Sequence, residues 1–195
     1  MQKARAERAE TGYPFWDVLL TQVADASTEA VPDILKEAQY HHDMGRVATT
    51  TEFLVTDAKQ VEETVEREVT GLVSGEILAL NSRIRGSDGA TRHLAMLDYR
   101  VPLTKSNETL VVQHLATLEL SGWLVASGRS FHFLGDTLLA GQDRLTEFLG
   151  RALLHAPIVD GRWVAHQLIE GACSLRITTG GAGQVDPFIV RRVEQ

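Results

Sequence analysis

The spacing of apolar residues predicts helices near the start of the chain. Apolar residues recur at helical spacing from Tyr13 to about Gly45. Within this range a second helical stretch begins at Pro32 and ends at Gly45. Proline in the first turn and glycine just past the end are the usual helix boundaries. We therefore expect an N-terminal helical segment over residues 1–48, followed by a mixed domain over residues 49–195.

Strand and helix patterns alternate in the first half of that domain. Residues 50–57 read as a short strand ending at Asp57, which can cap the next helix. Over 57–73, valines and a leucine recur at helical spacing in an otherwise charged segment. Residues 75–101 then read as two strands joined by the turn Gly-Ser-Asp-Gly at 86–89, which predicts a hairpin.

The second half repeats the alternation. A helix is expected over 106–122, with Ser106 as its cap, and another over 141–157. Between them, residues 123–136 read as two short strands that break at Ser127 and Gly128. The rest of the chain is made of short segments, with strand character in 173–181 and 186–193. A sheet with helices on one face is the natural packing, so the predicted class is α+β.

Composition narrows the class of protein. The chain has 195 residues and a formal net charge of −7, so it lacks the overall basic character of a free-standing, sequence-blind nucleic-acid binder. Its single cysteine, Cys173, excludes an internal disulfide and a cysteine-based zinc cluster. With no apolar run long enough for a membrane span and no signal-peptide pattern, a soluble cytoplasmic protein is expected.

Asp98 is the first candidate for chemistry, because it follows the apolar run Leu94–Leu97. Side chains alternate along a strand, so Asp98 and Arg100 are expected on one face. The alternative is a strand-end aspartate that only caps a turn.

Ser130 and His132 are the second candidate. They share one face of a predicted strand whose other face carries two phenylalanines. A hydroxyl and an imidazole in this arrangement, with Arg129 beside them, can hold a phosphate through hydrogen bonds. A half-exposed strand with ordinary polar side chains is the alternative.

The third candidate is the segment that contains Glu170 and Arg176. A carboxylate from Glu170 near Asp98 could share a divalent metal ion, and Arg176 could bind a triphosphate through its planar set of donors. The alternative is a surface glutamate and an arginine that extends its charged head to solvent.

Taken in order, these segments resemble the archaeo-eukaryotic primase superfamily, the primase-polymerases. Leu-Asp-Tyr-Arg at 97–100 resembles its first acidic motif, Ser-Phe-His at 130–132 its Ser-x-His motif, and Ile-Glu at 169–170 its third acidic position. The entry into the Ser-x-His strand, at 120–133, is the more specific part. The resemblance covers about residues 75–180.

The resemblance implies an RRM-like antiparallel sheet that joins nucleotides with Mg²⁺ or Mn²⁺. Asp98 and Glu170 would be metal ligands and, with His132, the catalytic residues. Nucleoside triphosphate would be bound by Arg129, Ser130, His132 and Arg176.

Position 100 departs from the family pattern, which has a second acid where this chain has Arg100. Either another acid such as Glu76, Asp136 or Asp160 substitutes, or the domain keeps the fold without polymerisation. The first interpretation is a metal-dependent nucleotidyltransferase for primer or nucleic-acid synthesis in DNA replication. The alternative is a catalytically degenerate nucleotide- or nucleic-acid-binding subunit that works with a partner protein. The N-terminal helices would suit a protein partner or a second copy of the chain.

Overall fold

The computed structural model describes residues 21–38, 50–55, 57–179 and 185–195. The chain divides into two compact units, Met1–Glu52 and Phe53–Gln195. In the first unit, α3 spans Val31–Ala38, within the helical stretch predicted from Pro32. Residues 21–24 are also helical. Residues 13–20 and 39–45 of the predicted N-terminal helices lie outside the described residues.

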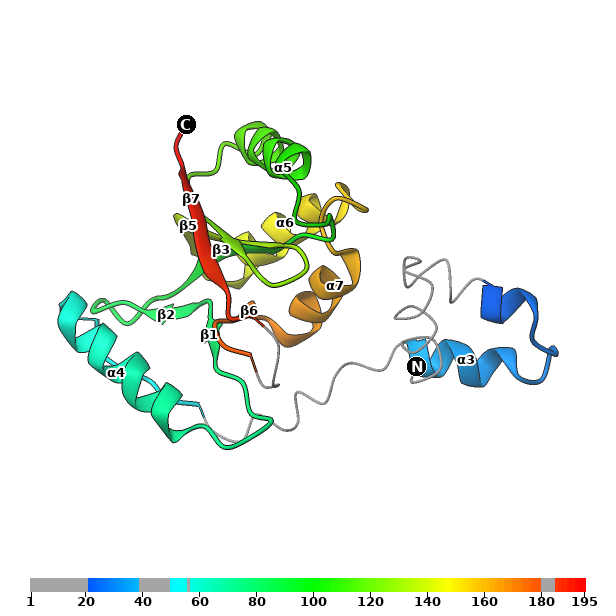
Figure 1. Ribbon diagram of the computed structural model, residues 1–195, viewed down its shortest axis with the longest axis horizontal. Helices are drawn as coiled ribbons and strands as arrows, with labels where there is room; N and C mark the ends of the chain where they lie inside the picture. The colour runs from blue at the N-terminus through cyan, green and yellow to red at the C-terminus, as the bar shows by residue number, and fades with distance from the viewer. Residues whose placement is uncertain (1–20, 39–49, 56, 180–184) are drawn as a thin grey trace. The chain divides into compact units, whose positions relative to one another are not determined.

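A five-stranded antiparallel sheet forms the centre of the second unit, in the strand order β2-β3-β5-β4-β7 (Figure 1). Its strands are β2 (Arg83–Arg85), β3 (Thr91–Asp98), β4 (Gly122–Ala126), β5 (Phe131–Ala140) and β7 (Phe188–Val193). The predicted hairpin at 86–89 joins β2 to β3. The predicted α+β class is confirmed.

The described part of this unit also contains the helices α4 (Ala58–Gly71), α5 (Lys105–Thr117), α6 (Gly141–Leu153) and α7 (Gly161–Glu170). Asp57 caps α4 as predicted, because its carboxylate accepts a hydrogen bond from the Gln60 amide at 2.8 Å. The cap of α5 is Thr104, two residues before the predicted Ser106. The predicted strand at 50–57 is wrong, because residues 50–55 form no strand.

Cross-strand register assigns the side chains to the two faces of the sheet. Leu97, Leu124 and Phe133 lie opposite one another on three neighbouring strands and are fully buried in the core. The other face, here called the cavity face, carries Asp98 and His132 as direct partners, with Val125 beside His132 on β4.

A second sheet pairs β1 (Ala79–Asn81) with β6 (Ser174–Arg176). Ser82 lies between β1 and β2, so one continuous stretch passes from the small sheet into the large one. Its hydroxyl accepts a hydrogen bond from the Cys173 amide at 2.9 Å and lies 3.1 Å from Nδ1 of His93. This buried cluster therefore joins β6 to β3.

Candidate functional site

Asp98 and His132 lie opposite each other on the two central strands. Nε2 of His132 is 3.6 Å from Oδ1 of Asp98. Burial, followed by the nearby Arg176 guanidinium, lowers the pKa of His132 to about 4. At neutral pH the imidazole is therefore uncharged, and its contact with Asp98 is not an ion pair.

Asp98 has a second acidic neighbour, Asp160. The amide of Asp160 donates a 2.8 Å hydrogen bond to the backbone oxygen of Asp98. Burial, and then the charge of Asp160, raise the pKa of Asp98 well above its usual range, while Arg176 acts in the opposite direction. The carboxylate of Asp160 also caps α7, accepting hydrogen bonds from the amides of Arg162 and Trp163.

Arg176 comes from the small sheet and completes this group. It lines the same cavity as His132, and its charge acts on the pKa values of both Asp98 and His132. Nη2 of Arg176 donates to the backbone oxygen of Ser127, and a Cβ at Gly128 would lie 3.2 Å from the same nitrogen. Gly128 has a φ of +95°, so the turn before β5 fits closely against Arg176.

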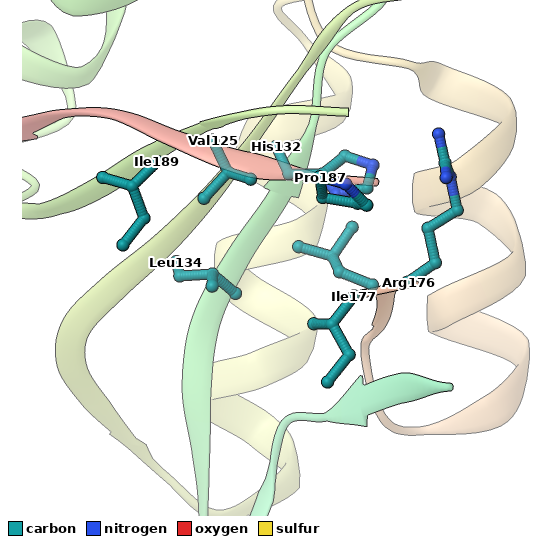
Figure 2. Close-up of a pocket in the computed structure, with 8 residues that line it drawn as sticks. Val125, His132, Leu134, Arg176, Ile177, Pro187 and Ile189 are labelled. Carbon is teal, nitrogen blue, oxygen red and sulfur yellow. The ribbon is translucent and has the colours of Figure 1, made fainter. Parts of the chain in front are cut away.

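A cavity of about 150 Å³ adjoins this group on the cavity face. Figure 2 shows His132 and Arg176 at one end of it and apolar side chains around the remainder. We call the end with His132 and Arg176 the polar end of the cavity. The apolar lining residues are Val125, Leu134, Leu175, Ile177, Pro187 and Ile189.

The hydroxyl of Ser130 is not free to donate a hydrogen bond to a ligand in this cavity. Its Oγ contacts the backbone oxygens of Tyr99 and Val101, the latter at 2.8 Å. A hydroxyl has one proton to donate, so these carbonyls occupy it. Ser130 therefore fastens the turn before β5 to the end of β3. Arg129, on the same turn, is exposed to solvent.

Glu170 is the predicted site residue that the structure does not bring to Asp98. It is the last residue of α7, whereas Asp98 adjoins Asp160 at the first turn of the same helix. Ten residues of α-helix span roughly 15 Å. Within the described parts of the chain, no group of three histidine, cysteine, aspartate or glutamate side chains could hold a metal ion. The predicted Asp98–Glu170 metal pair is thus not assembled.

The sequence analysis names Asp160 only as one of three acids that could substitute for the acid missing at position 100, and it predicts no helix at α7. The signals were present, because Asp160 precedes the helix as a cap and Gly171 ends it with a φ of +69°. The apolar spacing between these caps is short, so the pattern alone indicates no helix.

The comparisons with known proteins agree with this geometry. The family model of archaeo-eukaryotic primase 1D-like (AEP-like) domains matches residues 57–186, more than half of the chain. No curated protein and no solved structure matches. No helix in the described part of the chain is long and apolar enough to cross a membrane. Together with Asp98 and the Ser-x-His strand, the match shows that the chain belongs to the archaeo-eukaryotic primase 1D-like family.

Proposed function

We propose that the cavity face binds a nucleoside triphosphate, with the phosphates at the polar end of the cavity. The observation that carries this proposal is the convergence of His132 and Arg176, which come from two different sheets, beside an apolar cavity. An apolar pocket with a few convergent polar groups is the usual form of a small-molecule site.

The side chains at the polar end suit an anionic ligand. A guanidinium has five N–H donors, and those of Arg176 make two hydrogen bonds to described residues, at the backbone oxygens of Ser127 and Thr178. Neutral His132 carries one ring N–H that can donate to a phosphate oxygen. Arg129 extends from the neighbouring turn and would add a charge from solvent.

Nucleic acid is the second partner in this proposal, and an RRM-like sheet is its proposed platform. Trp123 lies opposite Leu134 on the cavity face, and its side chain is 42% exposed. The guanidinium of Arg192 is 5.2 Å from the Trp123 ring. An exposed aromatic ring next to a cation suits the stacking of a base from a single strand.

The residues present do not fit a two-metal centre. Such centres hold ions about 4 Å apart between shared carboxylates. Here position 100 is an arginine, Glu170 lies at the far end of α7, and the carboxylate of Asp160 is engaged in capping. We therefore favour a primase-like subunit that binds nucleotide and acts with a partner protein.

Metal-dependent nucleotidyl transfer with Mg²⁺ or Mn²⁺ is the second candidate. It is favoured by one observation, the backbone hydrogen bond between Asp160 and Asp98, which brings a second carboxyl group near Asp98. A primer-extension assay with Mn²⁺ separates the two candidates. Incorporation by the wild type that Asp98→Asn abolishes would establish the catalytic candidate.

Thermal unfolding with and without nucleoside triphosphate plus Mn²⁺ tests the proposed site. We expect the ligand to raise the melting temperature of the wild type by several degrees, because it binds the native state preferentially. The shift should be lost in Arg176→Gln and His132→Ala. A full shift in both variants would contradict the proposal.

A further inference from the structure

Arg100 lies on the cavity face, next to Asp98. Beyond β3, Tyr99 pairs with Val159 in an antiparallel bridge, and both side chains are buried in the core. The amide of Arg100 donates to the backbone oxygen of Ile158 at 2.9 Å, so the extended backbone continues through position 100. Because side chains alternate, Arg100 and Asp98 both face away from Tyr99.

The charge of Arg100 has no carboxylate partner in the described part of the chain. Several other arginines there are paired, for example Arg92 with Asp88 and Arg192 with Asp136. Nη2 of Arg100 is buried and has no hydrogen-bond partner among the described residues. A buried, unpartnered donor on a charged group is costly, and such groups usually belong to a site.

Arg100 and Arg176 meet at the turn before β5. Arg176 donates to the backbone oxygen of Ser127, whose amide donates to the backbone oxygen of Ser130. The Ser130 hydroxyl contacts the backbone oxygens of Tyr99 and Val101, the two neighbours of Arg100 in the chain. Two guanidinium groups spaced along one face match a chain of linked phosphates better than a single phosphate. Each can donate two parallel hydrogen bonds to phosphate oxygens.

We propose that Arg100 and Arg176 together bind a polyphosphate. The positive charge of the Arg100 side chain takes the place of a metal ion, so that binding needs no metal. This inference rests on the proposed function, because it assigns the phosphates of the nucleotide to these two residues. It also makes Arg100 the residue that decides whether the site needs a metal.

The test measures binding in the presence of EDTA, by calorimetry and by the shift in melting temperature. Two probes are used: ATP and inorganic tripolyphosphate. The wild type should bind tripolyphosphate without metal. Arg100→Gln should weaken that binding about tenfold or more, as expected for the loss of a charge-assisted hydrogen bond. Arg100→Lys should retain part of it. Arg85→Gln is the matched control, because Arg85 lies on β2, which pairs with the opposite end of β3.

A second readout keeps the test independent of folding defects. Without ligand, Arg100→Gln should melt at the same temperature as the wild type or higher, because it removes an unpaired, partly buried charge. Unchanged tripolyphosphate affinity in Arg100→Gln, or wild-type binding that requires Mn²⁺, would overturn the inference.

The two probes separate this inference from the proposed function. If tripolyphosphate binds through Arg100 and ATP does not bind, the anion site stands and the nucleotide assignment fails. If ATP binds only with Mn²⁺ and independently of Arg100, the nucleotide site stands and this inference fails. Binding of neither probe under any condition overturns both.

Discussion

The phenol oxygen of Tyr99 lies 2.9 Å from Nδ1 of His114, and this contact joins the end of β3 to α5. Nε2 of His114 is in turn 2.9 Å from Nδ1 of His155, beyond α6. The Tyr99 hydroxyl has no other hydrogen-bond partner in the described residues, so its proton goes to Nδ1 of His114. His114 then donates from Nε2 to His155.

Tyr99→Phe removes the first donor of this series and leaves Nδ1 of buried His114 without its partner. We expect a loss of about 1–3 kcal/mol in the free energy of unfolding, the usual cost of an unsatisfied buried group. Urea denaturation measures it. The control is the double variant Tyr99→Phe with His114→Leu, which removes the imidazole that Tyr99→Phe alone leaves unsatisfied. Restored stability in the double variant would confirm that the cost comes from the unsatisfied imidazole.

The same histidine predicts a loss of stability in acid. Burial, and then His155, lower the pKa of His114 from 6.5 to about 4. Between these values the unfolded chain binds a proton that the folded chain does not, so stability falls as the pH falls from about 6.5 to about 4. His132 contributes in the same window and with the same sign, since its pKa is also lowered to about 4.

Urea denaturation at several pH values, in the wild type and in His114→Leu with Tyr99→Phe, isolates this contribution. The double variant should lose less stability than the wild type over that pH range. An equal or steeper loss in the double variant would show that His114 is not responsible.

Ser130→Ala separates a structural role from a phosphate contact. Because the hydroxyl donates to a backbone carbonyl, we expect a loss of about 1 kcal/mol in stability and little change in the melting shift that nucleotide produces. Thermal unfolding with and without ligand measures both. If the ligand shift disappears while stability is kept, Ser130 contacts phosphate directly, as its motif predicts.

Gly122 is required by the close pairing of β4 with β5. A Cβ there would collide with the backbone oxygen of Leu134 and lie 2.7 Å from Cα of Gly135. Gly122→Ala should therefore cost about 3 kcal/mol, because backbone has to move. Gly150→Ala is the matched control.

Nothing lies within 4 Å of a Cβ at Gly150, in the middle of α6. Alanine there should raise stability by about 0.5–1 kcal/mol through its better helix propensity. Equal effects of the two substitutions in denaturant unfolding would rule out the packing argument for Gly122.

Much of the fold could be predicted from local pattern. The hairpin at 86–89 and helix α4 have strong local signals, a Gly-Ser-Asp-Gly turn and a capping Asp57. The strand that carries His132 was also predictable, because its polar and aromatic residues alternate, although Ser130 lies in the turn before it. Local pattern failed for 50–55, where apolar and β-branched residues form no strand because no neighbouring strand pairs with them.

The site was harder to predict because it depends on which segments meet. Sequence spacing brings Asp98 and Arg100 to one face, and the structure agrees. It cannot show that Asp160, a helix cap, adjoins Asp98, or that α7 carries Glu170 away. These placements follow from the bridge between Tyr99 and Val159, a contact between residues 60 positions apart in the chain.

The passage of one stretch of chain through both sheets at Ser82 links the two sides of the cavity. On one side of it β1 holds β6 and therefore Arg176; on the other, β2 borders the sheet that holds His132. The hydrogen bonds of Ser82 with His93 and Cys173 hold the two sheets together away from the cavity. The placement of Arg176 beside the cavity therefore depends on buried residues that do not line it.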